Sequence, residues 1–170
     1  MARIHVAAWQ AAYAGLLAPE LLAGVDEAHG RARLEPVVQA EPPLLWVAEA
    51  EGVVVGFVRF GASREDDVPP LTGEVFAINV DPSTWRRGHG RALLGVALEE
   101  LRAQGFAAAT LWVLEGNERA RSFYRDLGWR CDGATRVVLE VCEGLPRASV
   151  GGSDRGAGVN PAATPAGRSG

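Results

Sequence analysis

Residues 78–106 read INVDPSTWRRGHGRALLGVALEELRAQGF, and this stretch joins a strand, a glycine-rich loop and a helix. Alternating apolar residues predict a strand over 74–80, which Asp81-Pro82 ends. A helix is predicted directly after Gly90, because five apolar side chains recur on one helical face. They are Leu93, Leu94, Ala97, Leu98 and Leu101. The loop between strand and helix is therefore expected at a helix N-terminus.

The loop itself, WRRGHGR over 85–91, has the composition of an anion site. Gly88 and Gly90 let backbone N–H groups approach a ligand without a side chain in the way. The helix N-terminus adds unpaired N–H donors and about half a positive charge. Three arginines surround these donors in a chain whose formal net charge is −4. We therefore expect a pyrophosphate ligand; a tight turn with solvated arginines is the alternative explanation.

Two other phosphate-binding motifs are set aside by residue type. A P-loop needs a lysine, and this sequence contains none. The dinucleotide fingerprint needs a third glycine where Leu93 stands, and an acidic residue about 20 positions further on in a βαβ unit. Neither motif fits, so the loop is expected to serve another phosphate-containing ligand.

The remaining elements follow from periodicity, caps and turn residues. The predicted helices cover 3–13, 19–39 and, after an N-cap at Asn117, 118–127; the predicted strands cover 44–50, 53–60, 108–114 and part of 130–141. Strands come first as a hairpin and later alternate with helices. This order predicts an α/β (α+β) fold with a mixed central sheet flanked by helices.

Composition narrows the class of protein. The chain has 170 residues, of which 48% are hydrophobic and 22% charged, as in one ordinary globular domain. Its acidic balance argues against a nucleic-acid partner, which usually selects a basic face. No apolar run approaches the roughly 18 residues of a membrane span, and the first residues lack a signal-peptide pattern. We therefore expect a cytoplasmic protein without a membrane partner and without a metal.

The last part of the chain differs in composition. From residue 149 onward it consists mostly of Gly, Ala, Ser, Pro and Asn, with little apolar bulk. Such a segment buries too little surface to order itself. The expected organisation is one domain over 1–148 and a disordered tail over 149–170, with a last strand at best over 145–150.

Three segments together resemble the GNAT superfamily of acetyl-CoA-dependent N-acetyltransferases, in a bacterial branch. They are HVAAWQAAYAGLLAPELL (5–22), the stretch 78–106 quoted above and LWVLEGNERARSFYRDLGW (111–129). The resemblance implies the acyl-CoA N-acyltransferase fold. Family members usually begin with a strand, whereas this chain starts at a helix, so either the sheet lacks its first edge strand or the sequence is truncated before the helix. Trp85 also stands where the family usually has Gln or Arg.

The resemblance implies an N-acetyltransferase that moves the acetyl group of acetyl-CoA to a primary amine of a small molecule or peptide, by direct attack in a ternary complex. The implied cofactor-binding residues are Ile78, Asn79 and Val80 beside the pantetheine, Arg86, Arg87, Gly88, His89, Gly90 and Arg91 at the pyrophosphate, Asn117, and Tyr124 near the thioester sulfur.

Acetyl transfer also needs proton movement. An alkyl ammonium has a pKa of about 10.4, so a base must take its proton before attack. We expect Glu74 to be that base, with Glu49 or a chain of waters as alternatives. Alternation would place Glu74 on one face of the strand with Phe76, Ile78 and Val80. Tyr124 is the expected acid that protonates the departing thiolate.

The sequence says less about the residues that contact the amine acceptor. Trp9 and Tyr13 are candidate acceptor-site residues on the first helix, or else core aromatics. His5 and His29 are expected on helix surfaces. Two alternatives to the enzyme stay open: a degenerate acyl-CoA-binding sensor or interaction module, and a binder of a nucleotide other than coenzyme A. A homodimer is possible in either case.

Overall fold

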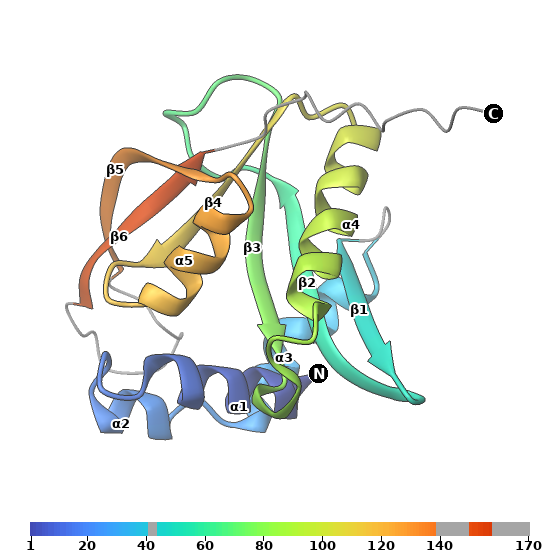
Figure 1. Ribbon diagram of the computed structural model, residues 1–170, viewed down its shortest axis with the longest axis vertical. Coiled ribbons are helices and arrows are strands. Elements are labelled where there is room, and N and C mark those ends of the chain that lie inside the picture. Colours follow the sequence, from blue (N-terminus) through green and yellow to red (C-terminus); the bar gives the residue numbers. More distant parts are fainter. Residues whose placement is uncertain (41–43, 139–149, 158–170) are drawn as a thin grey trace.

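The computed structural model describes residues 1–40, 44–138 and 150–157. Its centre is a six-stranded sheet in the order β1-β2-β3-β4-β6-β5 (Figure 1). The strands are β1 Leu45–Ala50, β2 Val53–Ala62, β3 Thr72–Val80, β4 Ala108–Leu114, β5 Arg130–Val138 and β6 Val150–Ala157. The helices are α1 Ala2–Tyr13, α2 Pro19–Ala23, α3 Glu27–Val38, α4 His89–Ala103 and α5 Glu118–Asp126, with a short 3-10 helix, η1, at Pro82–Thr84.

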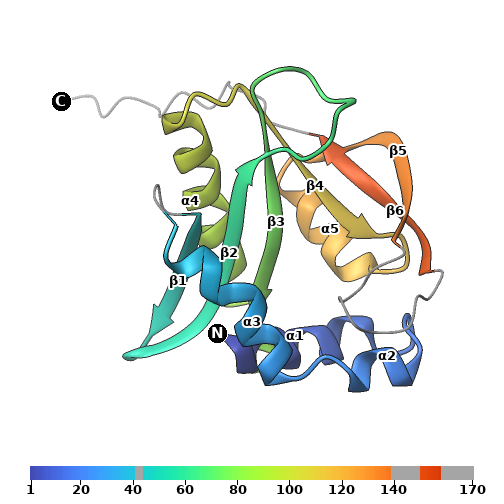
Figure 2. The same ribbon diagram turned by 180° about the vertical axis from the view of Figure 1, so that it is seen from behind.

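Helices cover the sheet on both sides. α4 and α5 lie on one face, in front of the sheet in Figure 1, and α1, α2 and α3 gather at the end of the sheet where β3 stops (Figures 1 and 2). β1 forms one edge of the sheet, and no strand precedes α1 in the described chain. The predicted mixed sheet flanked by helices is thereby confirmed.

The main core lies between α4 and the sheet. The predicted apolar face of α4 is confirmed, since Leu93, Leu94, Ala97 and Leu101 are all buried. They pack against buried side chains of the inner strands, among them Val58, Phe60, Val75 and Leu111. Replacing one such leucine by alanine typically costs about 2–5 kcal/mol, so this layer fixes the position of α4 on the sheet.

The single helix predicted over 19–39 is wrong, because the chain forms two helices there. Gly24 ends α2, and Asp26 begins α3 with its carboxylate accepting a hydrogen bond from the N–H of His29 at 2.8 Å. An Asp N-cap satisfies an N–H that a helix start otherwise leaves unpaired. This local hydrogen bond favours a new helix over continuation of the first.

A β-bulge interrupts the pairing of β3 with β2. Phe60 lies opposite Val75 and Arg59 lies opposite Ala77, so Phe76 is one extra residue on β3. An extra residue reverses the alternation of the side chains beyond it. The two halves of β3 therefore cannot present one continuous face.

The bulge separates Glu74 from the residues that follow it. A Cβ at Gly73 would meet Leu101 of α4 at 2.7 Å, so Gly73 faces α4 and Glu74 faces the opposite side. Beyond the bulge, Val80 faces α4 and lies against Gly56 and Gly90. The expectation that Glu74 shares a face with Ile78 and Val80 is therefore wrong.

β3 and β4 start as parallel neighbours and then separate. Residues 72–75 pair with residues 108–111, and the ladder between the two described strands stops there. β6 pairs with the other edge of β4, along residues 110–114. Figure 1 shows the two strands diverging toward α1. The backbone of β3 from Phe76 to Val80 therefore has no strand partner on the β4 side.

The disordered tail predicted from residue 149 is wrong for part of its length. Val150–Ala157 forms β6, which pairs antiparallel with both β4 and β5. A strand between two others is held by backbone hydrogen bonds on both edges, which do not require apolar side chains. The predicted last strand over 145–150 overlaps β6 only at Val150; residues 139–149 and 158–170 lie outside the described chain.

Candidate active site

The loop between β3 and α4 has the geometry of an anion site. Arg86 and Gly88 both adopt left-handed backbone conformations, with φ of 64° and 91°. Gly88 is the N-cap of the 15-residue α4, and no side chain caps that end of the helix. A Cβ placed on Gly88 would meet nothing within 4 Å, so the space in front of the helix is open. Uncapped N–H groups facing open space are suited to a phosphate oxygen.

Positive charge surrounds the same loop. Arg86, Arg87 and Arg91 are all exposed around the start of α4. Guanidinium groups bind phosphate through paired N–H donors, and the helix dipole adds to their field. Backbone donors and three cations together fit a pyrophosphate.

Trp85 fixes the position of this loop. Its indole N–H donates a hydrogen bond to the carbonyl of Val80 at 2.8 Å, and the guanidinium of Arg119 lies 4.1 Å from its ring centroid. The ring thus connects the end of β3 to α5. In the sequence, Trp85 stands out only because the family usually has Gln or Arg there. The structure shows that its side chain contacts Val80 and Arg119.

Three polar residues meet where α1 approaches α5. Asn117 is buried, and its side-chain oxygen accepts a hydrogen bond from the N–H of Ala120 at 3.1 Å, which confirms it as the N-cap of α5. The side chains of Tyr13 and Asn117 also share a hydrogen bond. Burial, and then the neighbouring Tyr13, raise the pKa of the Tyr124 phenol. Tyr124 therefore keeps its proton over the physiological pH range and can act as a donor.

Two neighbouring aromatic rings pack against Tyr124 and hold it in place. Its ring packs edge-on against Phe123 at 5.1 Å and Trp129 at 6.1 Å between centroids. Trp9 lies 4.9 Å from Tyr13 on α1. The structure thus brings Tyr13 to Tyr124 and Asn117, with Trp9 one helical turn behind.

His5 is not the surface residue that was expected. His5 lies one helical turn before Trp9 on α1, and the two ring centroids are 5.2 Å apart. The His5 side chain also hydrogen-bonds to the buried Asn79 of β3. Burial is the main cause that lowers the pKa of His5 to about 4, and the charges of Arg33, His29 and Arg59 lower it further. His5 is therefore neutral at pH 7 and ties α1 to β3.

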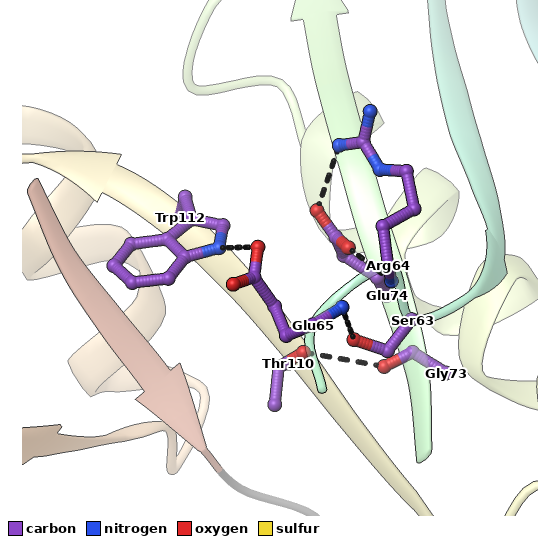
Figure 3. Close-up of polar contacts among 7 residues, drawn as sticks. All are labelled: Ser63, Arg64, Glu65, Gly73, Glu74, Thr110 and Trp112. Carbon is purple, nitrogen blue, oxygen red and sulfur yellow. Dashed lines mark hydrogen bonds and ion pairs between the residues drawn. The ribbon is translucent and has the colours of Figure 1, made fainter. Parts of the chain in front are cut away.

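Glu74 is buried and already has a partner. Glu74 is only 1% exposed. Both of its carboxylate oxygens accept hydrogen bonds from Arg64: Oε1 from the guanidinium at 3.0 Å and Oε2 from the backbone N–H at 3.2 Å (Figure 3). The Arg64 guanidinium also lies 4.4 Å from the Phe76 ring centroid. Sequence reasoning missed Arg64, which stands in a loop ten positions away with no local signal.

The loop that carries Arg64 is tied to β4 as well. Glu65 accepts a hydrogen bond from the indole N–H of Trp112 at 3.1 Å, and its own backbone N–H donates to Ser63 (Figure 3). Glu49, the alternative base, is exposed on the edge strand β1, and β2 lies between it and β3. Glu74 is thus the carboxylate that the structure brings to the centre of the sheet.

Comparison with known proteins places this arrangement in a family. The model of the Acetyltransferase (GNAT) family matches residues 8–129. Mycothiol acetyltransferase from Frankia alni is 39% identical over 93 residues, which cover 51% of this chain and 28% of that protein. The uncharacterized N-acetyltransferase YuaI from Bacillus subtilis is 30% identical over 122 residues, 69% of this chain and 66% of that protein. The matched part spans about a third of the mycothiol acetyltransferases.

Solved structures agree with the fold. The PaiA N-acetyltransferase from Thermoplasma acidophilum, in complex with coenzyme A, gives a TM-score of 0.64 at 19% identity over 91% of this chain and 89% of that one. The ribosomal-protein-S18-alanine N-acetyltransferase from Escherichia coli gives 0.54 at 25% identity over 75% and 74%. Among the described helices, none is long and apolar enough to cross a membrane. With a family model covering most of its length and a glycine-rich loop at the start of α4, this chain belongs to the GNAT acetyltransferase family.

Proposed function

We propose that this protein is an N-acetyltransferase that moves the acetyl group of acetyl-CoA to a primary amine by direct attack in a ternary complex. The observation that carries the proposal is the uncapped N-terminus of α4 at Gly88, which follows the part of β3 that no longer pairs with β4. One feature accepts a pyrophosphate, and the other leaves strand backbone free for an extended ligand.

The proposed cofactor residues follow from these two features. The backbone N–H groups from Arg86 to Arg91 would hold the pyrophosphate. The backbone of Ile78, Asn79 and Val80, which β4 leaves unpaired, would bind the amides of the pantetheine as a further strand would. Asn117, buried at the start of α5, would contact the same arm. Bound there, acetyl-CoA supplies an activated acyl group.

Tyr124 is the proposed proton donor to the departing sulfur. Its phenol is protonated because burial raises its pKa. A thiolate of pKa about 8.5 leaves more readily when a hydrogen bond or a proton reaches it as the carbon–sulfur bond breaks. Tyr13, beside Tyr124, would hold the phenol in position.

Glu74 is the proposed base, approached from the face opposite α4. Because of the bulge at Phe76, the Glu74 carboxylate faces away from the side of the sheet on which the cofactor would bind. An incoming amine would approach Glu74 from the side that the cofactor leaves free. Arg64 now occupies the space in front of it. An ammonium group has the same charge as the guanidinium, so the acceptor would replace Arg64 at Glu74 and give up its proton there.

The acceptor is proposed only by class, a small-molecule or peptide amine. The similar proteins are named for different acceptors, mycothiol in one group and ribosomal protein alanine in another. Trp9 and Tyr13, in the aromatic row of α1, remain our candidates for contact with the acceptor.

The test measures coenzyme A binding and turnover separately. Gly88→Asp places a negative charge at the loop and should weaken acetyl-CoA binding by about tenfold or more, since charged hydrogen-bond sites are worth about 1.5–3 kcal/mol. Gly88→Asn has the same shape without the charge and should weaken binding much less. Release of free thiol with a panel of primary amines then tests transfer. Tight binding with no thiol release from any amine would contradict the transferase and leave an acyl-CoA-binding module.

A further inference from the structure

Five cationic or titratable nitrogen groups gather on the sheet face opposite α4. They are His5 of α1, His29 and Arg33 of α3, Arg59 of β2 and Arg64 of the following loop, and we name them the cationic cluster. The position of Arg59 follows from alternation: Arg59 lies between Val58 and Phe60, which belong to the core under α4. Phe57, two positions before Arg59, packs with Ile4 and Leu34 on the other face. Arg59 therefore faces the side of α1 and α3.

Close packing of α1 and α3 assembles this cluster. A Cβ at Gly30 would lie 3.3 Å from Ala2, so the absence of a side chain at Gly30 lets the two helices touch. Ile4, Leu34 and Phe57 are buried where the helices meet β2. His5 directly follows Ile4, and Arg33 directly precedes Leu34. Arg59 lies two positions after Phe57 on β2.

The cluster has unmet polar groups. The Nε atom of Arg59 and the Nε2 atom of His29 are buried and have no hydrogen-bond partner within the described chain. The guanidinium groups of Arg59 and Arg64 lie 6.0 Å and 4.4 Å from the ring centroid of the same Phe76. A buried polar nitrogen without a partner is unfavourable, and a ligand that accepts its hydrogen bond removes that penalty.

Charge in the cluster is also unbalanced. Glu74 pairs with Arg64, but in the described residues neither Arg33 nor Arg59 has an ion-pair partner. Burial is the main cause that lowers the pKa of Arg59, with Arg33 and Arg64 adding to it. Like charges thus repel one another in this cluster, and an anion placed among them would remove the repulsion.

We propose that the cationic cluster binds an anionic group, a carboxylate or a phosphate, carried by the amine acceptor. The inference rests on the proposed function, and it narrows the acceptor from any primary amine to one that bears a negative charge. Arg33 and Arg59 would pair with the anion, and the acceptor's ammonium would lie at Glu74 after displacing Arg64. The acceptor would then match both the positive cluster and the buried carboxylate.

The position of the cluster separates it from the cofactor's phosphates. The phosphate loop begins α4 on one face of the sheet, whereas Arg59 lies on the other face with α1 and α3. Arg64 belongs to the cluster and contacts Glu74 directly. The anion would therefore bind beside the proposed base rather than beside the pyrophosphate.

The experiment compares amines with and without the anionic group. β-Alanine is paired with β-alaninamide, and phosphoethanolamine with ethanolamine, and kcat/KM is measured for each by thiol release. We expect the anionic member of at least one pair to be preferred by about tenfold or more, as for a hydrogen bond to a charged group. Which pair shows the preference separates carboxylate from phosphate. Arg33→Gln should bring that ratio close to one, mainly through KM.

A control on the same helix makes the result specific. Arg31 of α3 is exposed and pairs with Glu27 at 3.4 Å, so Arg31→Gln removes the same charge outside the cluster and should keep the preference. Equal kcat/KM within both pairs, or an unchanged preference in Arg33→Gln, would overturn the inference. So would weaker acetyl-CoA binding by Arg33→Gln with the preference intact, because the cluster would then serve the cofactor.

A binding measurement distinguishes failure of the inference from failure of the proposed function. Calorimetric titration of the protein with coenzyme A present, using N-acetyl-β-alanine against N-acetyl-β-alaninamide and N-acetyl-phosphoethanolamine against N-acetylethanolamine, needs no turnover. Preferential binding of an anionic compound that Arg33→Gln abolishes would support the cluster even if no amine released thiol. Equal binding within both pairs would contradict the cluster even if uncharged amines were acetylated.

Discussion

At the scale of single residues, Tyr124 carries the clearest chemical expectation. Tyr124→Phe removes the hydroxyl but keeps the ring that packs on Phe123 and Trp129. We expect kcat to fall by about 10²–10⁴, the usual worth of a proton donor, while acetyl-CoA binding stays within about twofold. Single-turnover rates and acetyl-CoA titration measure the two quantities.

The neighbouring hydroxyl provides the comparison. Tyr13→Phe should cause a smaller loss of kcat than Tyr124→Phe, since Tyr13 is proposed to position the donor and not to supply the proton. Because burial raises the pKa of Tyr124, the rate should also show no loss from its ionisation up to about pH 10. Full turnover by Tyr124→Phe would rule out its assignment as the acid.

His5 predicts how stability depends on pH. Its pKa falls from 6.5 to about 4 on folding, so between these values the unfolded chain binds a proton that the folded chain does not. Stability should therefore decline as pH drops below 6.5 and stop declining from this cause below about 4. The slope is at most about 1.4 kcal/mol per pH unit for one group.

The His5 effect is measured as a difference. His5→Gln has no titrating group, so denaturant unfolding from pH 4 to 7 should show a flatter profile than the unsubstituted protein. Arg33, His29 and Arg59 face His5 and are unchanged in both proteins, so their own contributions largely cancel. Parallel profiles for the two proteins would mean that His5 titrates normally in the folded state.

At the scale of elements, Gly56 determines how closely β2 approaches β3 and α4. A Cβ there would lie 3.0 Å from the carbonyl oxygen of Asn79 and 3.1 Å from Leu93. Gly56→Ala should cost about 1–3 kcal/mol, as overpacking usually does, and lower Tm by about 2–4 °C per kcal/mol. It should also raise KM for acetyl-CoA, because it displaces Asn79 on β3.

Gly95 is the matched control within α4. A Cβ at Gly95 would meet nothing within 4 Å, and its backbone is ordinary helix. Gly95→Ala should therefore raise stability by about 0.5–1 kcal/mol through helix propensity and leave KM for acetyl-CoA alone. If both variants were equally stable, close packing at Gly56 would not be the reason for its glycine.

Elements formed by local signals could be predicted from the sequence, and elements formed by distant contacts could not. α4 and the cap at Asn117 follow from residues within a few positions, and both are confirmed. The bulge at Phe76 depends on pairing with β2, which alternation along β3 does not reveal. The contact of Arg64 with Glu74 depends on how a loop folds back, so the partner of the candidate base stayed hidden until the structure showed it.

At the scale of the whole molecule, the last strand closes the sheet in a way that composition does not suggest. β6 lies between β4 and β5, and β5 has no other strand partner in the described sheet. Buried Trp129, directly before β5, packs against Tyr124. The position of the proposed acid thus depends on a glycine-rich strand far along the chain.

Truncation tests this dependence. Ending the chain at residue 149 removes β6, and with it ladder hydrogen bonds on both of its edges, worth about 1 kcal/mol each, so a loss of about 5 kcal/mol or more is expected. Ending it at residue 157 keeps every described strand and should leave Tm within about 3 °C. Thermal unfolding measures both, and acetyl-CoA binding should fail only in the shorter chain. Equal Tm values for the two shortened chains would mean that β4 and β5 keep their positions without β6. The domain boundary expected at residue 148 would then describe the stable unit.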